Sequence, residues 1–228
     1  MIETVHMRWL KRQAYSSCLQ AMQHFTNHRN EKTPDEIWLL EHDPVFTQGQ
    51  NGKPEHILNA GNIPVIQTDR GGQITYHGPG QLMIYTLIDL KRKKLTVHAF
   101  VSLLQQTVID VLREHAIDAY AKREAPGVYV IVHGYEHKIC SIGLRVRRGC
   151  TYHGIAFNVA MDLEPFNRIN PCGFANLKMT QWADLGGPQN TQVASQRLIN
   201  YLLKNFRYTN ANYDTEKRDE PNEATWPR

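Results

Sequence analysis

Residues 69–85 read DRGGQITYHGPGQLMIY, the most unusual stretch of the chain. Glycines let a backbone approach a ligand closely and expose its N–H groups as donors. A tight structural turn is the plainer interpretation, because glycine and proline are ordinary turn residues. A turn has no need of so many functional side chains, so we interpret the stretch as a ligand-binding loop, although it matches no nucleotide-binding template. Four glycines and one proline lie within the eleven positions 70–80, together with Arg70, Thr75, Tyr76 and His77.

The segments around this loop are predicted to alternate between strands and helices. Leu82–Leu90, which leaves the loop, is too apolar for one exposed face and is therefore expected in the middle of a sheet. Other strands are bounded by turn residues such as Pro34 and Gly134, and Gly134 is expected to close a hairpin. The predicted strands are Glu36–Glu41, Pro64–Thr68, Leu82–Leu90, Gly127–His133, Lys138–Val146 and Cys150–Val159.

Helices are predicted where apolar residues recur with a period near 3.6. The clearest apolar stripe runs from Val97 to Leu112, behind a possible cap at Thr96. Strands and helices in mixed order predict an α/β (α+β) fold, with a mixed β-sheet flanked by helices. A first helix is marked by Tyr15, Cys18, Leu19, Met22 and Phe25, and a last one by Ile199, Leu202, Leu203 and Phe206.

Length and composition favour one domain. The chain has 228 residues, 41% of them hydrophobic, which is enough for a core without a disulfide or metal staple. Its 26 Lys and Arg against 22 Asp and Glu give a positive charge too weak to indicate nucleic-acid binding. With no signal peptide and no membrane-spanning run, we expect a cytoplasmic protein with four free cysteines. Residues 209–228 are polar and unpatterned, and are expected to form a flexible tail.

The glycine-rich loop also resembles a known signature. RGGQITYHGPGQ (70–81) resembles that of the octanoyltransferases, also called lipoate-protein ligase B. The resemblance runs from about residue 36 to residue 182, with the motifs in the family's order. One glycine-rich match would be weak, but five in order are specific. The other four are LEHDPVFTQGQ (40–50), APGVYV (125–130), KICSIGLRVRRGCTYHGIAFNV (138–159) and RINPCG (168–173).

The resemblance implies both a fold and an activity. The fold is that of the catalytic domain of biotin and lipoyl protein ligases, and residues 1–208 would form a single octanoyltransferase domain. The family moves an octanoyl group from octanoyl-acyl carrier protein to a lysine of lipoyl domains. These acceptors belong to 2-oxoacid dehydrogenases and to the glycine-cleavage H protein. The reaction is the first step of protein lipoylation, and it needs no ATP, no other cofactor and no metal.

The resemblance also assigns the site residue by residue. The family's acyl-bearing cysteine falls on Cys172 in INPCG, and its paired lysine falls on Lys138 in KICSIG. The substrate-binding residues come from three segments of the chain. They are Arg70, Gly71, Gly72, Gln73, Ile74, Thr75, Tyr76 and His77, then Ser141, Ile142 and Gly143, and finally Gly154, Ile155 and Ala156.

A cysteine paired with a lysine is also chemically reasonable by itself. A free thiol is only a few per cent thiolate at neutral pH, and an ammonium beside it favours the thiolate. A lysine partly desolvated under an acyl chain could lose its proton and serve as the base. We therefore expect Lys138 to take the proton of Cys172 and later to help deprotonate the acceptor amine.

Other interpretations of these residues stay open. His77 or His153 is an alternative base for Cys172, although the family pattern indicates that both shape the pocket and donate hydrogen bonds. Lys138 alone would be a surface charge in most proteins. Cysteines are often small buried hydrophobic residues, which we expect of Cys18, Cys140 and Cys150. A zinc site of Cys140, Cys150, His153 and Cys172 is conceivable, but it would lack CxxC spacing.

Three rival functions also stay open. An ATP-using lipoate or biotin ligase of the same fold would form an adenylate and need no nucleophilic cysteine. A cysteine hydrolase or amidase would release the free acid, and a non-catalytic module would bind the carrier without acquiring its acyl group. The basic run KRKK (91–94) is most simply a solvated approach to a helix, or a docking point for the acidic acyl carrier protein.

Overall fold

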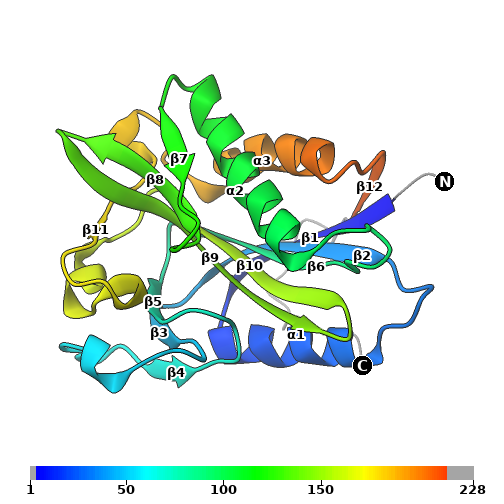
Figure 1. Cartoon of the computed structure of the whole chain (residues 1–228), viewed down its shortest axis with the longest axis horizontal. Helices are drawn as coiled ribbons and strands as arrows, with labels where there is room; N and C mark the ends of the chain where they lie inside the picture. The colour runs from blue at the N-terminus through cyan, green and yellow to red at the C-terminus, as the bar shows by residue number, and fades with distance from the viewer. Residues whose placement is uncertain (1–3, 215–228) are drawn as a thin grey trace.

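The computed structural model describes residues 4–214, which fold around one large mixed sheet (Figure 1). Within these residues the sheet has nine strands in the order β12-β1-β2-β6-β10-β9-β8-β7, and β11 pairs with β9 off this path. The strands are β1 (Thr4–Gln13), β2 (Asp35–His42), β6 (Gln81–Leu87), β7 (Ala119–Ala121), β8 (Gly127–Val132), β9 (Tyr135–Arg147), β10 (Cys150–Asn158), β11 (Lys178–Met179) and β12 (Asn210–Tyr213).

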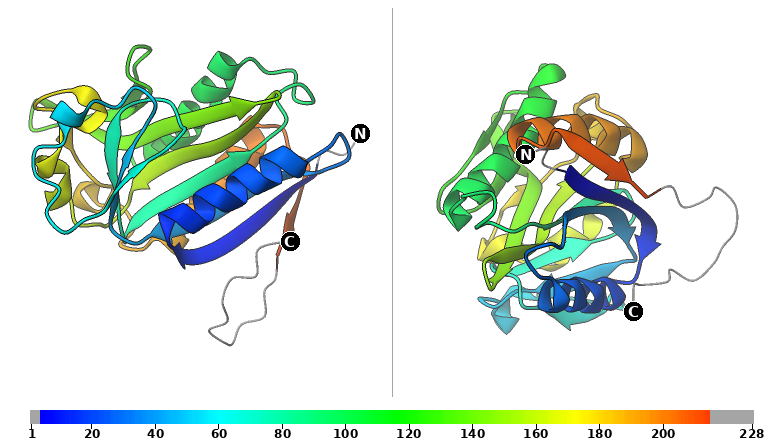
Figure 2. Two further views of the ribbon diagram at one scale, coloured as in Figure 1. Left: turned by 90° about the horizontal axis from the view of Figure 1, so that it is seen from below. Right: turned by 90° about the vertical axis from the view of Figure 1, so that its right-hand side faces the viewer.

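Helices cover both faces of this sheet (Figure 2). One face of β2, with Ile37 and Leu39, packs in a core shared with α2 (Val97–Glu114) and α3 (Thr191–Asn205). The other face, with Trp38 and Leu40, packs against α1 (Tyr15–His28). Alternate residues of one strand thus serve two cores, as the two-residue period of a strand requires. Among the described residues, no helix is both long and apolar enough to cross a bilayer.

A smaller sheet of three strands stands beside the large one. Its order is β4-β3-β5, with β3 at Val45–Gln48, β4 at Val65–Gln67 and β5 at Ile74–His77. Short 3-10 turns connect this part of the chain, at Pro54–His56, Glu164–Arg168, Pro171–Gly173 and Ala183–Leu185. The small sheet and the turn Glu164–Arg168 share an apolar cluster around Phe46, Tyr76 and Phe166.

The two sheets meet where β8 stops covering the edge of β9. The β8–β9 pairing ends at Gly127–Ser141, and β9 continues alone on this edge to Arg147. The glycine-rich loop takes the vacant place, and the N–H of Gly71 donates to the carbonyl of Leu144 at 2.9 Å. This junction leaves a cavity between the two sheets.

Most sequence predictions of the fold are confirmed. The class is a mixed sheet flanked by helices, as expected, and β6 lies between β2 and β10 in its interior. All three helices and all six predicted strands are present, with ends shifted by a few residues. Thr96 caps α2 by accepting from the N–H of Ala99. Gly134 closes the β8–β9 hairpin with a φ of 81°, and His133 before it also has a positive φ.

Two expectations need correction. Residues 74–77, interpreted as part of a glycine-rich loop, form β5, because their backbone pairs antiparallel with β3. The start of the expected tail, Asn210–Tyr213, pairs parallel with β1, because main-chain hydrogen bonds at a sheet edge need no apolar side chains. Residues 215–228 of that tail lie outside the described residues.

Candidate active site

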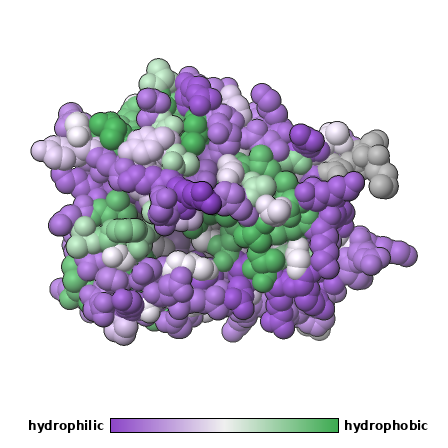
Figure 3. Space-filling model, viewed as in Figure 1, coloured by the Kyte–Doolittle hydropathy of each residue, from purple (hydrophilic) through white to green (hydrophobic). Residues whose placement is uncertain are grey.

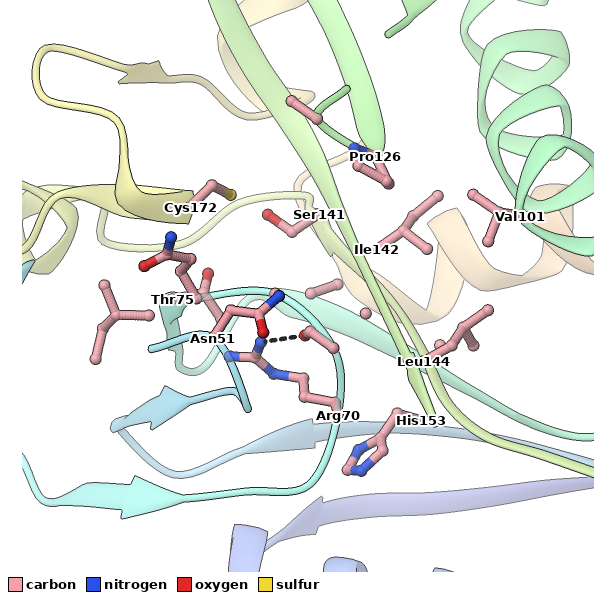
Figure 4. Close-up of a pocket in the computed structure, with 18 of the residues that line it drawn as sticks. Asn51, Arg70, Thr75, Val101, Pro126, Ser141, Ile142, Leu144, His153 and Cys172 are labelled. Atoms are coloured by element: carbon pink, nitrogen blue, oxygen red, sulfur yellow. Dashed lines mark hydrogen bonds between the residues drawn. The ribbon is translucent and has the colours of Figure 1, made fainter. Parts of the chain in front are cut away.

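A cavity of about 500 Å³ opens at the junction of the two sheets. Its walls come from the glycine-rich loop, the free part of β9, the first turns of α2 and the loop that carries Cys172 (Figure 4). The face shown in Figure 3 is hollowed near its centre, with apolar side chains on both sides of the hollow. A cavity with apolar walls and a few polar groups is typical of a small-ligand site.

Cys172 sits in a tight turn at the edge of this cavity. Its φ of 57° and ψ of 15° are left-handed, which is uncommon for a residue other than glycine, and Gly173 follows with a φ of 80°. The turn is tied by two hydrogen bonds, from Gly173 N–H to the Asn170 carbonyl and from Phe174 N–H to the Pro171 carbonyl. Strained backbone of this kind is often found at functional sites. Here it holds a half-buried thiol at the cavity wall.

The closest polar partner of this thiol is Lys138 on β9. The ammonium Nζ lies 3.0 Å from Sγ of Cys172, and the lysine is only 1% exposed. The N–H of Thr180 donates to the carbonyl of Lys138, and this hydrogen bond helps to hold β9 in place at the lysine. Two residues 34 positions apart are thus brought into hydrogen-bonding contact.

Tyr129 of β8 forms the floor beneath Lys138. The ammonium lies 5.1 Å from the centre of the Tyr129 ring, and Nζ of Lys122 lies 5.0 Å from the same centre. The Tyr129 hydroxyl donates to the carbonyl of Ala125, which keeps the ring in place. An aromatic face near a cation stabilises its charge, and more so where water is excluded.

The surroundings of Lys138 decide its charge. Burial by itself lowers the pKa of Lys138, but attraction to Cys172 and Tyr129 outweighs it, so the pKa lies above its ordinary value. Lys138 is therefore charged at neutral pH whenever the sulfur opposite it is a thiolate. If the sulfur lost its charge, burial would be the larger remaining influence and the pKa would fall.

The other three cysteines are poor nucleophiles by comparison. All of them are buried, and burial raises the pKa of each thiol, to about 12 for Cys18. A buried thiol with a raised pKa is unreactive. This agrees with the packing role predicted for Cys18, Cys140 and Cys150.

Arg70 organises the glycine-rich loop from inside. Its Nη2 donates to the carbonyl (2.6 Å) and the hydroxyl (2.8 Å) of Thr47, and its Nη1 donates to the carbonyl of Gly71 (2.9 Å). Close packing around Arg70 explains two glycines: a Cβ at Gly49 would lie 2.7 Å from Nη1, and one at Gly143 would lie 2.9 Å from Cδ. The guanidinium thus holds the loop against β3. The Arg70 side chain also fills the space that a side chain at position 49 or 143 would need.

His77 and His153 both line the cavity, but each is held by other partners. His77 Nδ1 lies 2.7 Å from Oε1 of Gln81, and its Nε2 lies 3.0 Å from the Thr47 hydroxyl. His153 Nε2 lies 2.9 Å from a carboxylate oxygen of Asp69. Burial is the main reason that the pKa of each histidine is lowered. The hydrogen bonds of their ring nitrogens support a pocket-shaping role for both histidines. The hydrogen-bond partner of Cys172 is Lys138 and not a histidine.

All but two of the sixteen predicted site residues line this one cavity. The exceptions are Tyr76, which packs in the apolar cluster of the small sheet, and Ile155, which packs in the main core. Both lie on strands and point away from the cavity while their neighbours point into it, as strand geometry requires. Sequence reasoning missed several lining residues, namely Tyr15, Asn51, Met83, Tyr85, Val97, Val101, Glu124, Ala125, Pro126, Leu144 and Phe174.

The residues proposed for a zinc site are not gathered. Cys140 and Cys150 are both buried in strands, and Cys172 lies at the cavity wall. Across residues 4–214, no group of three or more His, Cys, Asp or Glu side chains is placed to hold a metal ion.

Comparison with known proteins gives a consistent picture. A family model described as the lipoyl protein ligase A/B catalytic domain matches residues 14–207. An octanoyltransferase of Shewanella oneidensis is 58% identical over 205 residues, which cover 90% of this chain and 93% of the relative. One of Shewanella piezotolerans is 54% identical over 207 residues, covering 91% and 92%.

Solved structures show the same fold at low identity. A bipartite lipoate protein ligase of Thermoplasma acidophilum superposes with a TM-score of 0.72 at 16% identity, covering 92% of this chain and 87% of its own. A biotin protein ligase of Aquifex aeolicus has a TM-score of 0.52 at 12% identity, covering 89% and 68%. At these identities the likeness concerns the fold alone.

Proposed function

This chain belongs to the octanoyltransferases, whose catalytic domain is of the lipoyl protein ligase A/B type, and we propose that it carries the octanoyl group as a thioester on Cys172. It is an acyltransferase that moves octanoyl groups in protein lipoylation. The proposal assigns the reaction to one catalytic domain, residues 1–208, with Cys172 and Lys138 as its catalytic residues. The contact of 3.0 Å between Lys138 Nζ and Cys172 Sγ carries the proposal.

In the first half of the reaction, the thiolate of Cys172 attacks the carbonyl carbon of the donor thioester. The tetrahedral intermediate then breaks the bond to the donor sulfur. Lys138, charged in the resting pair, gives its proton to the departing donor thiolate. The products are acylated Cys172, a free donor thiol and a neutral Lys138. Burial lowers the pKa of Lys138 once the opposite charge on sulfur is gone, which favours this proton transfer.

The second half returns both residues to their first state. The acceptor lysine attacks the Cys172 thioester as a neutral amine and gives one proton to Lys138. The intermediate then breaks the carbon–sulfur bond, which leaves the amide on the acceptor and a thiolate on Cys172 facing a charged lysine. Thioester exchange is nearly balanced and amide formation is downhill, so the cycle needs no ATP.

The remaining side chains would place the acyl chain. Val101, Ile142 and Leu144 lie on the side of the cavity away from Cys172 (Figure 4). We propose that the alkyl tail lies against them while the thioester carbonyl stays near the lysine. Arg70 and His77 would hold the loop that forms the opposite wall.

The partners and the compartment are part of the same proposal. The donor would be octanoyl-acyl carrier protein, and the acceptors lipoyl domains of 2-oxoacid dehydrogenases and the glycine-cleavage H protein. The relatives' name and the lipoyl-domain system of a structural neighbour support this assignment. A cytoplasmic reaction is proposed because a catalytic thiol needs a reducing compartment.

Intact-protein mass spectrometry tests the thioester directly. Wild type, Cys172→Ser and Lys138→Met are each mixed with octanoyl-acyl carrier protein, without ATP or acceptor. We expect an octanoyl adduct on wild type that hydroxylamine removes. Cys172→Ser should show no adduct of this lability, and in Lys138→Met the adduct should form slowly. Adding an apo-lipoyl domain should discharge the adduct and acylate the domain.

Other outcomes would point to the rival functions. Transfer that requires ATP and proceeds in Cys172→Ser would indicate a ligase. Release of free octanoate without an acceptor would indicate a hydrolase. Binding of the carrier with no adduct and no transfer would leave a non-catalytic module, and any of these results would contradict the covalent mechanism.

A further inference from the structure

Two basic turns lie against each other at one end of the large sheet. The first is the turn between β6 and α2, with Lys91–Lys94, and the second joins β9 to β10 and carries Arg147 and Arg148. The N–H of Leu90 donates to the carbonyl of Gly149 at 2.9 Å. A Cβ at Gly149 would lie 3.0 Å from Cε of Lys91. We call Lys91, Lys94, Arg145, Arg147 and Arg148 the basic band.

The basic band lies beside the end of the cavity that is away from Cys172, next to Leu144 and the start of α2. Arg145 donates to the side-chain oxygen of Gln50 at 2.7 Å, and the next residue, Asn51, lines the cavity. Lys94 precedes the start of α2, where Val97 lines the cavity and is 46% exposed. Two members of the band, Arg145 and Lys94, are thus close in sequence or by hydrogen bond to residues that line the cavity.

The charges of the basic band have no carboxylate partner among residues 4–214. Lys91, Lys94 and Arg147 are exposed, and no ion pair within 4 Å joins any of them to an acidic side chain in the described chain. Arg145 donates to an amide oxygen of Gln50, and Arg148 donates to main-chain carbonyls at the end of α1.

Two acidic groups near the basic band, Asp69 and Asp89, are hydrogen-bonded to other residues. Asp69 accepts hydrogen bonds from Gln23 and Tyr152 and lies within hydrogen-bonding distance of His153. Asp89 accepts from two backbone N–H groups of the first basic turn. None of these carboxylates forms an ion pair with the basic band, so the band is a local cluster of positive charge, while the exposed carboxylate of Glu124 lines another part of the cavity.

The rest of the KRKK run behaves differently. Arg92 pairs with buried Asp35 at 2.5 Å and donates to two main-chain carbonyls. Lys93 donates to the carbonyl of Phe206 and lies over the ring of Tyr208. These two cations hold the turn in place, so only its outer members, Lys91 and Lys94, are available to a partner.

We propose that the basic band is the docking surface for the acidic carrier protein that delivers the acyl thioester. The proposal rests on the proposed function, which requires a protein-bound thioester to reach Cys172. A band of like charge beside the cavity would attract an acidic helix, and the carrier's acyl-bearing arm would then reach across the cavity opening to Cys172. Exposed Val97 and the apolar side chains beside the hollow in Figure 3 would give the carrier an apolar contact at the same place.

The test compares two donors that differ only in the carrier. A triple variant, Lys91→Glu, Lys94→Glu and Arg147→Glu, reverses the three exposed charges that make no described side-chain hydrogen bond. The matched control reverses two exposed charges on α3, Arg197→Glu and Lys204→Glu. Transfer to an apo-lipoyl domain is measured with octanoyl-acyl carrier protein and with octanoyl-pantetheine, at about 50 mM and about 500 mM sodium chloride.

With the carrier donor at low salt, we expect kcat/KM of the triple variant to fall about tenfold or more, mostly through KM. With octanoyl-pantetheine it should stay within about twofold of wild type, and the control should match wild type with both donors. High salt should lower the wild-type rate with the carrier donor and affect the variant less.

Three results would overturn the inference. The first is an unchanged kcat/KM of the triple variant with the carrier donor. The second is an equal loss with both donors, which would indicate damage to the cavity. The third is a rise in KM for the lipoyl domain alone, which would assign the band to the acceptor. Failure of wild type with both donors would instead remove the proposed function, so the two failures are distinguishable.

Discussion

Gly127, the first residue of β8, lies directly against the side chain of Lys138. A Cβ at position 127 would lie 2.3 Å from Cε and 3.0 Å from Nζ of the lysine, and 2.5 Å from the carbonyl oxygen of Cys140. The φ of Gly127 is 152°, which L side chains rarely adopt. The glycine of the APGVYV segment is therefore needed for steric reasons. Because it has no side chain, it leaves the space through which Lys138 reaches Cys172.

Replacing Gly127 by alanine should displace the lysine. We expect Gly127→Ala to lower kcat/KM by about 100-fold, since displacement by about 1 Å can cost that much. Stability should fall by about 1–3 kcal/mol, because the backbone is strained and the core overpacked. The measurements are octanoyl transfer and chemical denaturation. Gly134→Ala is the control, because Gly134 also has a positive φ (81°) but no atom would lie within 4 Å of its Cβ. Equal activity loss in both variants would contradict the steric explanation.

Tyr129 should matter through its ring more than through its hydroxyl. Tyr129→Phe keeps the aromatic face beneath Lys138 and loses the hydrogen bond to Ala125, whereas Tyr129→Leu loses the face. Without the aromatic face, the charged form of Lys138 is less favoured and the thiolate of Cys172 loses support. We therefore expect alkylation of Cys172 by iodoacetamide at pH 7 to slow about tenfold in Tyr129→Leu. Tyr129→Phe should stay within about threefold. Similar rates in the two variants would exclude the ring as a support for the lysine charge.

Much of the fold could be predicted from periodicity. Helical spacing located α1, α2 and α3, and turn residues located the β8–β9 hairpin. β1 was not predicted, although Val5, Met7 and Trp9 alternate with polar residues in the pattern of a half-buried strand. β12 carries almost no apolar signal, since its place depends on backbone pairing with β1.

The site could be predicted only through motifs. Cys172 and Lys138 were named from the family resemblance, and their contact of 3.0 Å depends on a turn and a strand that meet only in the folded chain. Val97 and Val101 were read as part of the core stripe of α2, but both line the cavity. The helical period of apolar residues shows which face of the helix is apolar. It cannot show whether that face packs against the core or lines a cavity.

Buried neutral histidines should make the protein sensitive to acid. His42 lies within hydrogen-bonding distance of the Gln13 carbonyl and the Tyr85 hydroxyl, and burial is the main reason that its pKa is lowered to about 4. Between pH 6.5 and about 4 the unfolded chain binds a proton there that the native state does not bind. The free energy of unfolding should therefore fall as pH falls through this window, by about 1.4 kcal/mol per unit for this one histidine.

Urea denaturation at pH 7 and pH 4.5 measures this effect. His42→Gln should reduce the difference between the two pH values by about 2–3 kcal/mol, because its side chain does not titrate. Tyr85→Phe is the control, since it removes the same hydrogen bond but keeps the histidine. The lowered pKa values of His77 and His153 predict that part of the acid sensitivity remains in the variant. An unchanged pH dependence in His42→Gln would show that His42 is not the group responsible.

Val101 should set the length of the acyl chain. It lies with Ile142 and Leu144 on the side of the cavity away from Cys172, where the proposed function places the alkyl tail (Figure 4). A phenylalanine at position 101 would fill that end, and an octanoyl tail would then have to bend or displace a helix. Since one or two methylene groups in an apolar pocket are worth about 1–3 kcal/mol, we expect Val101→Phe to lower the kcat/KM ratio of octanoyl to butanoyl donors at least tenfold.

The acyl-pantetheine series from four to ten carbons gives this ratio without any contribution from carrier docking. Ser102→Phe serves as the control, because Ser102 is the neighbouring residue on α2 and is exposed. It should keep the wild-type preference. Loss of activity with every chain length in Val101→Phe would mean that the helix has moved as a whole. A preserved octanoyl preference would mean that the tail lies elsewhere in the cavity, against the polar side that contains Tyr85 and His153.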